Sequence, residues 1–112
     1  MFTLSTDQGY LLYAQAVDMR KSFDSLSGLI KNDLSLNPRS GDVYLFINKN
    51  RDKAKLLHWN GGSYQMYYKR LERGTFELPF YGKKVLSIKL DYTRVVLLMD
   101  GISIKNLHQR KR

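Results

Sequence analysis

The sequence predicts an α+β fold: a small antiparallel sheet, a meander of about four to five strands, packed against one amphipathic helix, with a second short helix as an option near the C-terminus. Three observations predict it. Apolar side chains recur at helical spacing in the first third of the chain. Runs of β-branched and aromatic residues then follow one another with short connections. A length of 112 residues, 43% of them hydrophobic, suits one modest core. We expect a single domain over residues 1–104 and a basic tail over residues 105–112.

The first strand is expected over residues 10–17 (YLLYAQAV), where Asp18 ends it. Asp18 is then placed to cap a helix that begins at Met19. Four apolar side chains recur every three or four residues and lay one stripe along this helix: Met19, Phe23, Leu26 and Ile30. Gly28 in the helix interior indicates a close backbone approach.

The middle of the chain predicts an antiparallel meander. A turn-rich loop over residues 37–42 leads into a strand over residues 43–48 (VYLFIN). Residues 54–60 (AKLLHWN) and 63–69 (SYQMYYK) form the next two strands. Gly61-Gly62 supplies the two-residue hairpin turn between them, because positive φ angles cost glycine nothing.

The C-terminal third is less regular. Residues 85–90 predict another strand. Residues 91–99 favour a helix that is capped by Asp91 and stopped by Gly101. The Val-Val-Leu-Leu run and the Asp100-Gly101 pair also suit a β-hairpin.

The composition excludes several classes of protein. The chain has no cysteine, so disulfides, thiolate zinc sites and a cysteine nucleophile are ruled out. No apolar run reaches the ~18 residues that a membrane span needs. No basic segment precedes the first apolar stretch, so we expect no cleaved signal peptide. The sequence therefore predicts a soluble, cytoplasmic domain without a membrane partner.

The charge is unevenly distributed. Residues 1–48 carry four Lys or Arg against five Asp or Glu, whereas residues 49–112 carry fifteen against five. A pI near 9.9 with the excess in the second half indicates a polyanionic partner. A charge that serves solubility alone is the other interpretation.

Catalytic and metal-binding signatures are absent from the sequence. His58 and His108 are far apart and belong to no zinc motif, and no nucleophile motif is found. We expect His58 to be a partly buried, hydrogen-bonded strand residue. Four acids that could in principle serve an enzyme also suit caps, turns or counter-charges: Glu72, Glu77, Asp91 and Asp100. We therefore expect no enzyme activity and no cofactor.

Cations surround the predicted hairpin. Four of them alternate from the preceding loop into the strand, so their side chains are expected to share one face: Lys49, Arg51, Lys53 and Lys55. Three more lie at or just after the end of the return strand, near the same end of the hairpin: Lys69, Arg70 and Arg73. Arg20 and Lys21 extend this set. Repeated cations on a β-ribbon favour contacts with nucleic-acid phosphates over a merely solvated face.

Aromatic side chains are interleaved with these cations. Four of them offer stacking faces for unpaired bases or anchors for a protein interface: Trp59, Tyr64, Tyr67 and Tyr68. On a meander, about half of such side chains should instead face the core.

Three segments resemble the TnpB-type accessory proteins of the insertion-sequence-66 family of bacterial mobile elements. They are residues 18–30 (DMRKSFDSLSGLI), residues 40–79 (SGDVYLFINKNRDKAKLLHWNGGSYQMYYKRLERGTFELP) and residues 99–104 (MDGISI). The resemblance implies a protein that is encoded beside a DDE-type transposase and a small helix-turn-helix protein and is needed for efficient transposition. It carries no catalytic motif.

The residues at positions of the family pattern include much of the helix and the hairpin. They are Asp18, Arg20, Lys21, Phe23, Asp24, Arg51, Asp52, Lys53, Leu56, Trp59, Lys69 and Arg70. Ser22 and Ser25 stand where the family often has glycine.

Two functions remain open from the sequence. The first is a non-catalytic accessory factor that binds DNA at the element ends, or the transposase–DNA complex, through the basic face. With about five to seven neutralised phosphates, log K should fall with log[salt] at a slope of roughly −5 to −6. The second is a protein adaptor that binds the transposase or the helix-turn-helix protein through exposed aromatics without touching DNA.

Overall fold

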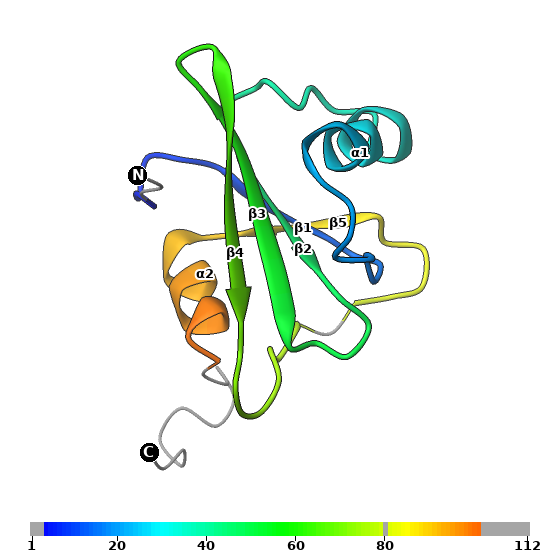
Figure 1. Ribbon diagram of the computed structural model, residues 1–112, viewed down its shortest axis with the longest axis vertical. Coiled ribbons are helices and arrows are strands. Elements are labelled where there is room, and N and C mark those ends of the chain that lie inside the picture. Colours follow the sequence, from blue (N-terminus) through cyan, green and yellow to red (C-terminus); the bar gives the residue numbers. More distant parts are fainter. Residues whose placement is uncertain (1–3, 80, 102–112) are drawn as a thin grey trace.

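The computed structural model describes residues 4–79 and 81–101. This part of the chain forms one sheet and two helical segments (Figure 1). In chain order the elements are β1 (Tyr10–Tyr13), α1 (Phe23–Gly28), its π-helical continuation η1 (Leu29–Asp33), β2 (Val43–Ile47), β3 (Lys53–Asn60), β4 (Ser63–Arg70), β5 (Ser87–Leu90) and α2 (Tyr92–Met99). The predicted tail at residues 105–112 lies outside the described residues.

The strands lie in the order β4-β3-β2-β1-β5. β1 and β2 are parallel, and the other neighbouring pairs are antiparallel. Figure 1 shows α1 and α2 on opposite sides of the sheet. The predicted α+β class and the meander of β2, β3 and β4 are confirmed. The second short helix near the C-terminus is present as α2, so each face of the sheet has its own helix, and α1 is the crossover that a parallel pair requires.

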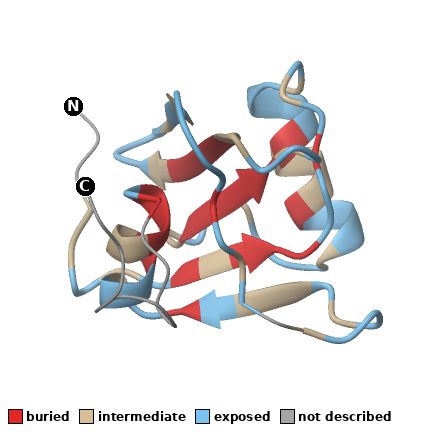
Figure 2. Cartoon of the chain, turned by 90° about the horizontal axis from the view of Figure 1, so that it is seen from below, coloured by how far each residue is buried: buried red, intermediate tan, exposed pale blue. Residues whose placement is uncertain are grey.

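The core has two halves, one on each face of β2. Leu45 and Ile47 pack with residues of α2, while Tyr44 and Phe46 pack with residues of α1 and η1. All five residues of β2 are buried, which explains why the strand reads as an unbroken apolar run. Figure 2 shows buried residues concentrated in the central strands. β4, at the edge, has no buried residue.

The first helix begins later than predicted. β1 ends at Tyr13 and α1 begins at Phe23, with Ser22 as its N-cap. The Asp18 carboxylate instead closes a separate turn by accepting the Arg20 amide at 2.8 Å. Local hydrogen bonding of this kind competes with helix formation. The Ser22 amide donates to Ser25 Oγ at 2.9 Å, so these two serines stabilise the actual helix start.

The predicted apolar stripe holds for only part of its length. Leu26 and Ile30 are fully buried, but Phe23 is 41% exposed. A Cβ placed on Gly28 would meet Asn32 Nδ2 at 3.9 Å, an ordinary contact, so the expected close backbone approach is wrong. From Leu29 onward the helix widens into a π-helical turn, which changes the direction of the following side chains.

The hairpin and the C-terminal helix follow the sequence closely. Gly61 and Gly62 have φ angles of 60° and 86°, the conformation that a tight two-residue turn requires. Asp91 caps α2 by accepting the Arg94 amide at 2.8 Å. Gly101, at φ 74°, follows the end of the helix. The helical interpretation of residues 91–99 is therefore confirmed, and the hairpin alternative is wrong.

One core residue lies in a segment that the sequence did not mark. Phe76, between β4 and β5, is fully buried in the half of the core beneath α2. Its amide donates to the carbonyl oxygen of Arg51 at 2.6 Å, and the Leu71 amide donates to that of Asp52 at 2.8 Å. The segment that follows β4 thus fastens the β2–β3 loop to the core.

Alkaline pH is expected to destabilise the fold in part through Tyr13. Burial, reinforced by the hydrogen bond that its hydroxyl donates to Asp33 at 2.7 Å, raises the pKa of Tyr13 from 10.0 to about 12. The folded state therefore holds this proton more tightly than the unfolded state. This contribution is complete below pH 10 and is lost as the pH rises toward 12.

Urea unfolding between pH 8 and pH 11 measures this effect. Tyr13→Phe should lose less stability over the range than the wild-type protein. A residual decline is expected because burial also raises the pKa of Tyr10 and Tyr44. Equal declines in the two proteins would show that Tyr13 does not contribute.

Candidate nucleic-acid interface

The β2–β3 loop is held rigidly by Asn48. Its Oδ1 accepts the amides of Asp52 and Lys53, both at 3.0 Å, and its Nδ2 donates to Asp52 Oδ1 at 2.7 Å. This last hydrogen bond, followed by the charge of Lys53, lowers the pKa of Asp52. The loop therefore presents its side chains from a preformed backbone.

Arg51 adopts a left-handed conformation in this loop, with φ 58°. That region normally suits glycine or asparagine, and an ordinary side chain there costs roughly 1–2 kcal/mol. The hydrogen bond from Phe76 to the Arg51 carbonyl helps to impose it. An exposed arginine kept at a strained position is the kind of outlier that favours a functional role.

A groove of about 610 Å³ lies between this loop and the turn after β1; we call it the loop groove. Three cations line it: Arg20, Lys49 and Lys53. Tyr68, 53% exposed, lines it as well. The remaining lining residues are Ala16, Val17, Asp18, Met19, Asn48 and Asn50.

Lys55 has a structural position instead of the expected place on the surface. It is 7% exposed, and its Nζ donates to the carbonyl oxygens of Met19 and Lys21 at 2.6 and 2.7 Å. The same ammonium lies 4.9 Å from the centre of the Tyr68 ring. Lys55 thus joins the turn after β1 to the sheet, beside the Tyr68 ring that lines the loop groove.

The cations of the hairpin divide between the two faces of the sheet. Lys53 pairs with Arg70 across β3 and β4, so both lie on the side of α1 together with Lys55. Lys69 points to the side of α2, where its Nζ is 3.7 Å from Asp100. The predicted proximity at one end of the hairpin is confirmed, but a single cationic face that includes Lys69 is wrong.

Local acids pair with several of the remaining cations. Asp18, Asp52 and Glu72 lie 2.7, 3.5 and 3.1 Å from Arg20, Lys53 and Arg70 respectively. The hydrogen bonds from Arg20 lower the pKa of Asp18 to about 2. In the described part of the chain, no ion pair involves Lys21, Lys49, Arg51 or Arg73.

The four aromatic side chains also divide between the two faces of the sheet. Trp59 and Tyr64 pack edge to face with ring centres 4.8 Å apart, and the Arg39 guanidinium lies 4.5 Å above Trp59. Tyr67, 40% exposed, faces the side of α2, where it lines a pocket of about 240 Å³. Tyr68 is the one that borders the loop groove.

Residues considered for catalysis have structural contacts. His58 is 8% exposed, and its Nε2 lies 3.1 Å from Gln8 Nε2, which confirms the expected hydrogen-bonded strand histidine. Asp91 caps α2. Over residues 4–79 and 81–101, no three His, Asp or Glu side chains come together as a metal site would require. No described helix is long and apolar enough to cross a bilayer.

The fold and the groove define a small mixed α+β protein with a cationic loop. Residues 8–109 match the family described as IS66 Orf2 like protein. The chain therefore belongs to this family.

Two similar proteins come from Sinorhizobium fredii (strain NBRC 101917 / NGR234). The uncharacterized protein y4jC is 30% identical over 69 residues, which are 62% of this chain and 59% of y4jC. The uncharacterized protein y4hO is 34% identical over 62 residues, 55% of this chain and 54% of y4hO. The chain thus spans somewhat more than half the length of each relative. No solved structure matches the chain.

Proposed function

We propose that this insertion-sequence accessory protein binds nucleic acid, with the phosphate backbone in the loop groove. The arrangement of Lys49, Lys53 and Arg20 around the exposed ring of Tyr68 supports this function best. Phosphates need several cations at fixed spacing, and an aromatic ring beside them provides a surface for a base. The element DNA is the proposed ligand, and the transposase is the proposed functional partner.

The preformed loop strengthens the proposal. Because Asn48 and Phe76 fix the backbone, the loop that carries the cations at positions 49, 51 and 53 needs little backbone ordering when they bind. The ion pairs of Arg20 and Arg70 are exposed, so a phosphate can replace the carboxylate at small cost.

The structure also reduces the expected number of phosphate contacts. The ammonium of Lys55 binds backbone carbonyls, and Lys69 lies on the opposite face. With about four contacts, the slope of log K against log[salt] should be roughly −3 to −4.

The test is a salt-titrated fluorescence anisotropy assay with element-end DNA. Lys49→Gln/Lys53→Gln should weaken binding at moderate salt and reduce the magnitude of the slope by about 2. The control is Lys89→Gln/Arg94→Gln, which removes the same charge from exposed positions on β5 and α2 and should leave the slope nearly unchanged. Equal slopes for the groove variant and the wild-type protein would exclude the loop groove as the site.

A second candidate is the adaptor function, and the exposed edge of β4 favours it. In a hairpin with a two-residue loop, alternate residues of the return strand direct their backbone groups outward; here these are Tyr64, Met66 and Tyr68. No other strand in the described part of the chain pairs with this edge. A strand of the transposase could add to it. Co-purification with transposase from nuclease-treated lysate at high salt would support this function.

A further inference from the structure

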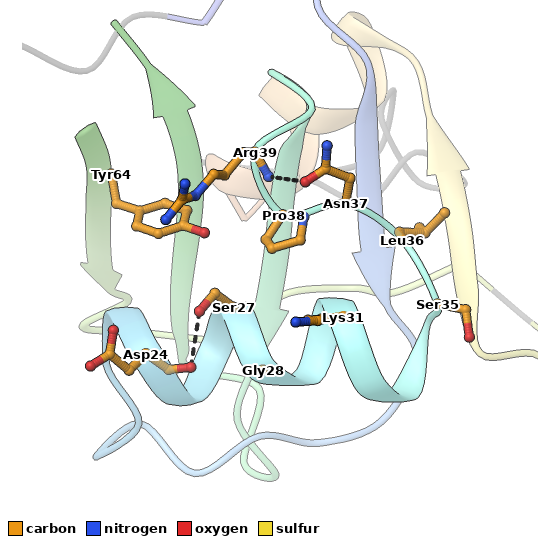
Figure 3. Close-up of a pocket in the computed structure, with 10 residues that line it drawn as sticks. All are labelled: Asp24, Ser27, Gly28, Lys31, Ser35, Leu36, Asn37, Pro38, Arg39 and Tyr64. Atoms are coloured by element: carbon orange, nitrogen blue, oxygen red, sulfur yellow. Dashed lines mark hydrogen bonds between the residues drawn. The ribbon is translucent and has the colours of Figure 1, made fainter. Parts of the chain in front are cut away.

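A second groove lies at the opposite end of the hairpin from the loop groove. It has a volume of about 670 Å³ and runs between α1–η1 and the loop before β2 (Figure 3); we call it the outer groove. Its lining residues are Asp24, Ser27, Gly28, Lys31, Ser35, Leu36, Asn37, Pro38, Arg39 and Tyr64.

Arg39 is held in the outer groove from both ends. Its amide donates to Asn37 Oδ1 at 2.9 Å, and the buried Tyr44 hydroxyl donates to the Asn37 carbonyl at 3.1 Å, which fixes the loop to the sheet. At the other end of the residue, the Arg39 guanidinium stacks on the Trp59 ring. Among the described residues the guanidinium N–H groups have no hydrogen-bond or ion-pair partner, so they remain available for an oxyanion.

Lys31, on the helical wall, lines the same groove as Arg39. Figure 3 shows its ammonium on the side of Ser27. Two uncommon backbone features form the same wall: the π-helical turn that carries Lys31, and Ser35 at φ 55°. Both kinds of feature occur preferentially at functional sites. The charged residues that line the groove are Asp24, Lys31 and Arg39, so its net charge is positive.

A row of three side chains on β4 joins the two grooves. Tyr64 lines the outer groove and Tyr68 lines the loop groove, with Met66 between them on the same face. The four residue steps from Tyr64 to Tyr68 span ~13 Å along the strand, which is the length of this row. Cationic sites therefore lie at both ends of an apolar and aromatic path.

We propose that one single strand of nucleic acid binds along β4, with backbone phosphates in both grooves and bases on the row from Tyr68 to Tyr64. This inference rests on the proposed function and adds the form of the ligand and a second phosphate site at Lys31 and Arg39. Tyr68 is exposed, while Tyr64 and Met66 are half-buried and offer one side each. A single strand is favoured because its bases can stack on the exposed ring, whereas the bases of a duplex are already stacked.

The test compares oligo(dT) strands of about 2 and about 12 nucleotides: at about 3.4 Å per nucleotide the short strand is shorter than the ~13 Å row and the long strand exceeds it. The wild-type protein should bind the long strand much more tightly, because two linked contacts add. Lys31→Gln/Arg39→Gln should reduce the ratio of long-strand to short-strand affinity by about tenfold. Tyr68→Ala should weaken long-strand binding by about tenfold. Lys89→Gln/Arg94→Gln, which removes the same two residue types elsewhere, should leave the ratio as in the wild-type protein.

An unchanged ratio in Lys31→Gln/Arg39→Gln would overturn the second site. Tighter binding of a duplex than of a single strand of equal length, with no effect of Tyr68→Ala, would overturn the single-strand proposal. Neither result contradicts the loop groove as a phosphate site, which fails only if Lys49→Gln/Lys53→Gln binds as the wild-type protein does.

Discussion

Phe76→Ala is expected to lower the free energy of unfolding by about 3–5 kcal/mol, the usual cost of truncating a fully buried phenylalanine. Phe76 has no exposed surface and belongs to the same buried cluster as Leu45, Leu56 and Val95, in the half of the core beneath α2. The residue lies between β4 and β5 in a segment without regular structure, and it is the fully buried side chain of the described part of that segment, where Leu71 and Leu78 pack against the same cluster as partly buried side chains.

Urea unfolding followed by circular dichroism measures this cost. The matched control is Phe23→Ala: the same substitution on α1, at a side chain that is 41% exposed, should cost less than about 1 kcal/mol. Similar losses for the two variants would contradict the role assigned to Phe76.

Truncation of Phe76 should also affect the loop groove. Its amide donates to the carbonyl of Arg51, so the loop loses an anchor if the segment moves. At a temperature where Phe76→Ala remains folded, we expect weaker nucleic-acid binding than in the wild-type protein.

Lys55→Met should lower the free energy of unfolding by about 2–3 kcal/mol. Methionine retains much of the buried stem but donates no hydrogen bond, so the carbonyl oxygens of Met19 and Lys21 lose a charged donor. A hydrogen bond to a charged group contributes roughly 1.5–3 kcal/mol, and water can partly replace it here. The turn after β1 would also loosen, and binding in the loop groove should weaken.

Lys53→Met is the control for this prediction. Lys53 lies two residues earlier on the same face of β3, but its side chain is 31% exposed and pairs only with Asp52 at 3.5 Å. Lys53→Met should therefore change the free energy of unfolding by less than about 0.5 kcal/mol. Chemical denaturation compares the two variants. If both changes had equal effects, Lys55 would be an ordinary surface lysine.

The sequence predicted an element correctly where a few adjacent residues determine its turn or its caps. Gly61-Gly62 defined the hairpin, and Asp91 with Gly101 defined α2. The start of α1 was missed because Asp18 could cap either a helix or a turn. The choice depends on Lys55, 36 residues away from Met19, whose ammonium binds the Met19 carbonyl that a helix would have used.

The candidate site was predicted in part. Strand alternation correctly placed Lys53 and Lys55 on one face, but alternation does not show which lysine the opposing turn buries. Arg39 and Lys31 were not selected, because no local pattern brings a loop before β2 and a helical turn together around Tyr64. A tertiary contact, the stacking of Arg39 on Trp59, creates that site.

The most direct test of the proposed interface is an NMR titration of the ¹⁵N-labelled protein with element-end DNA, read as amide chemical-shift changes. The account predicts that the largest changes occur at residues 48–53, at Arg20 and at Tyr68, with Arg94 on α2 little affected. Changes concentrated on α2 and around Lys69, with the amides of residues 48–53 unmoved, would contradict it.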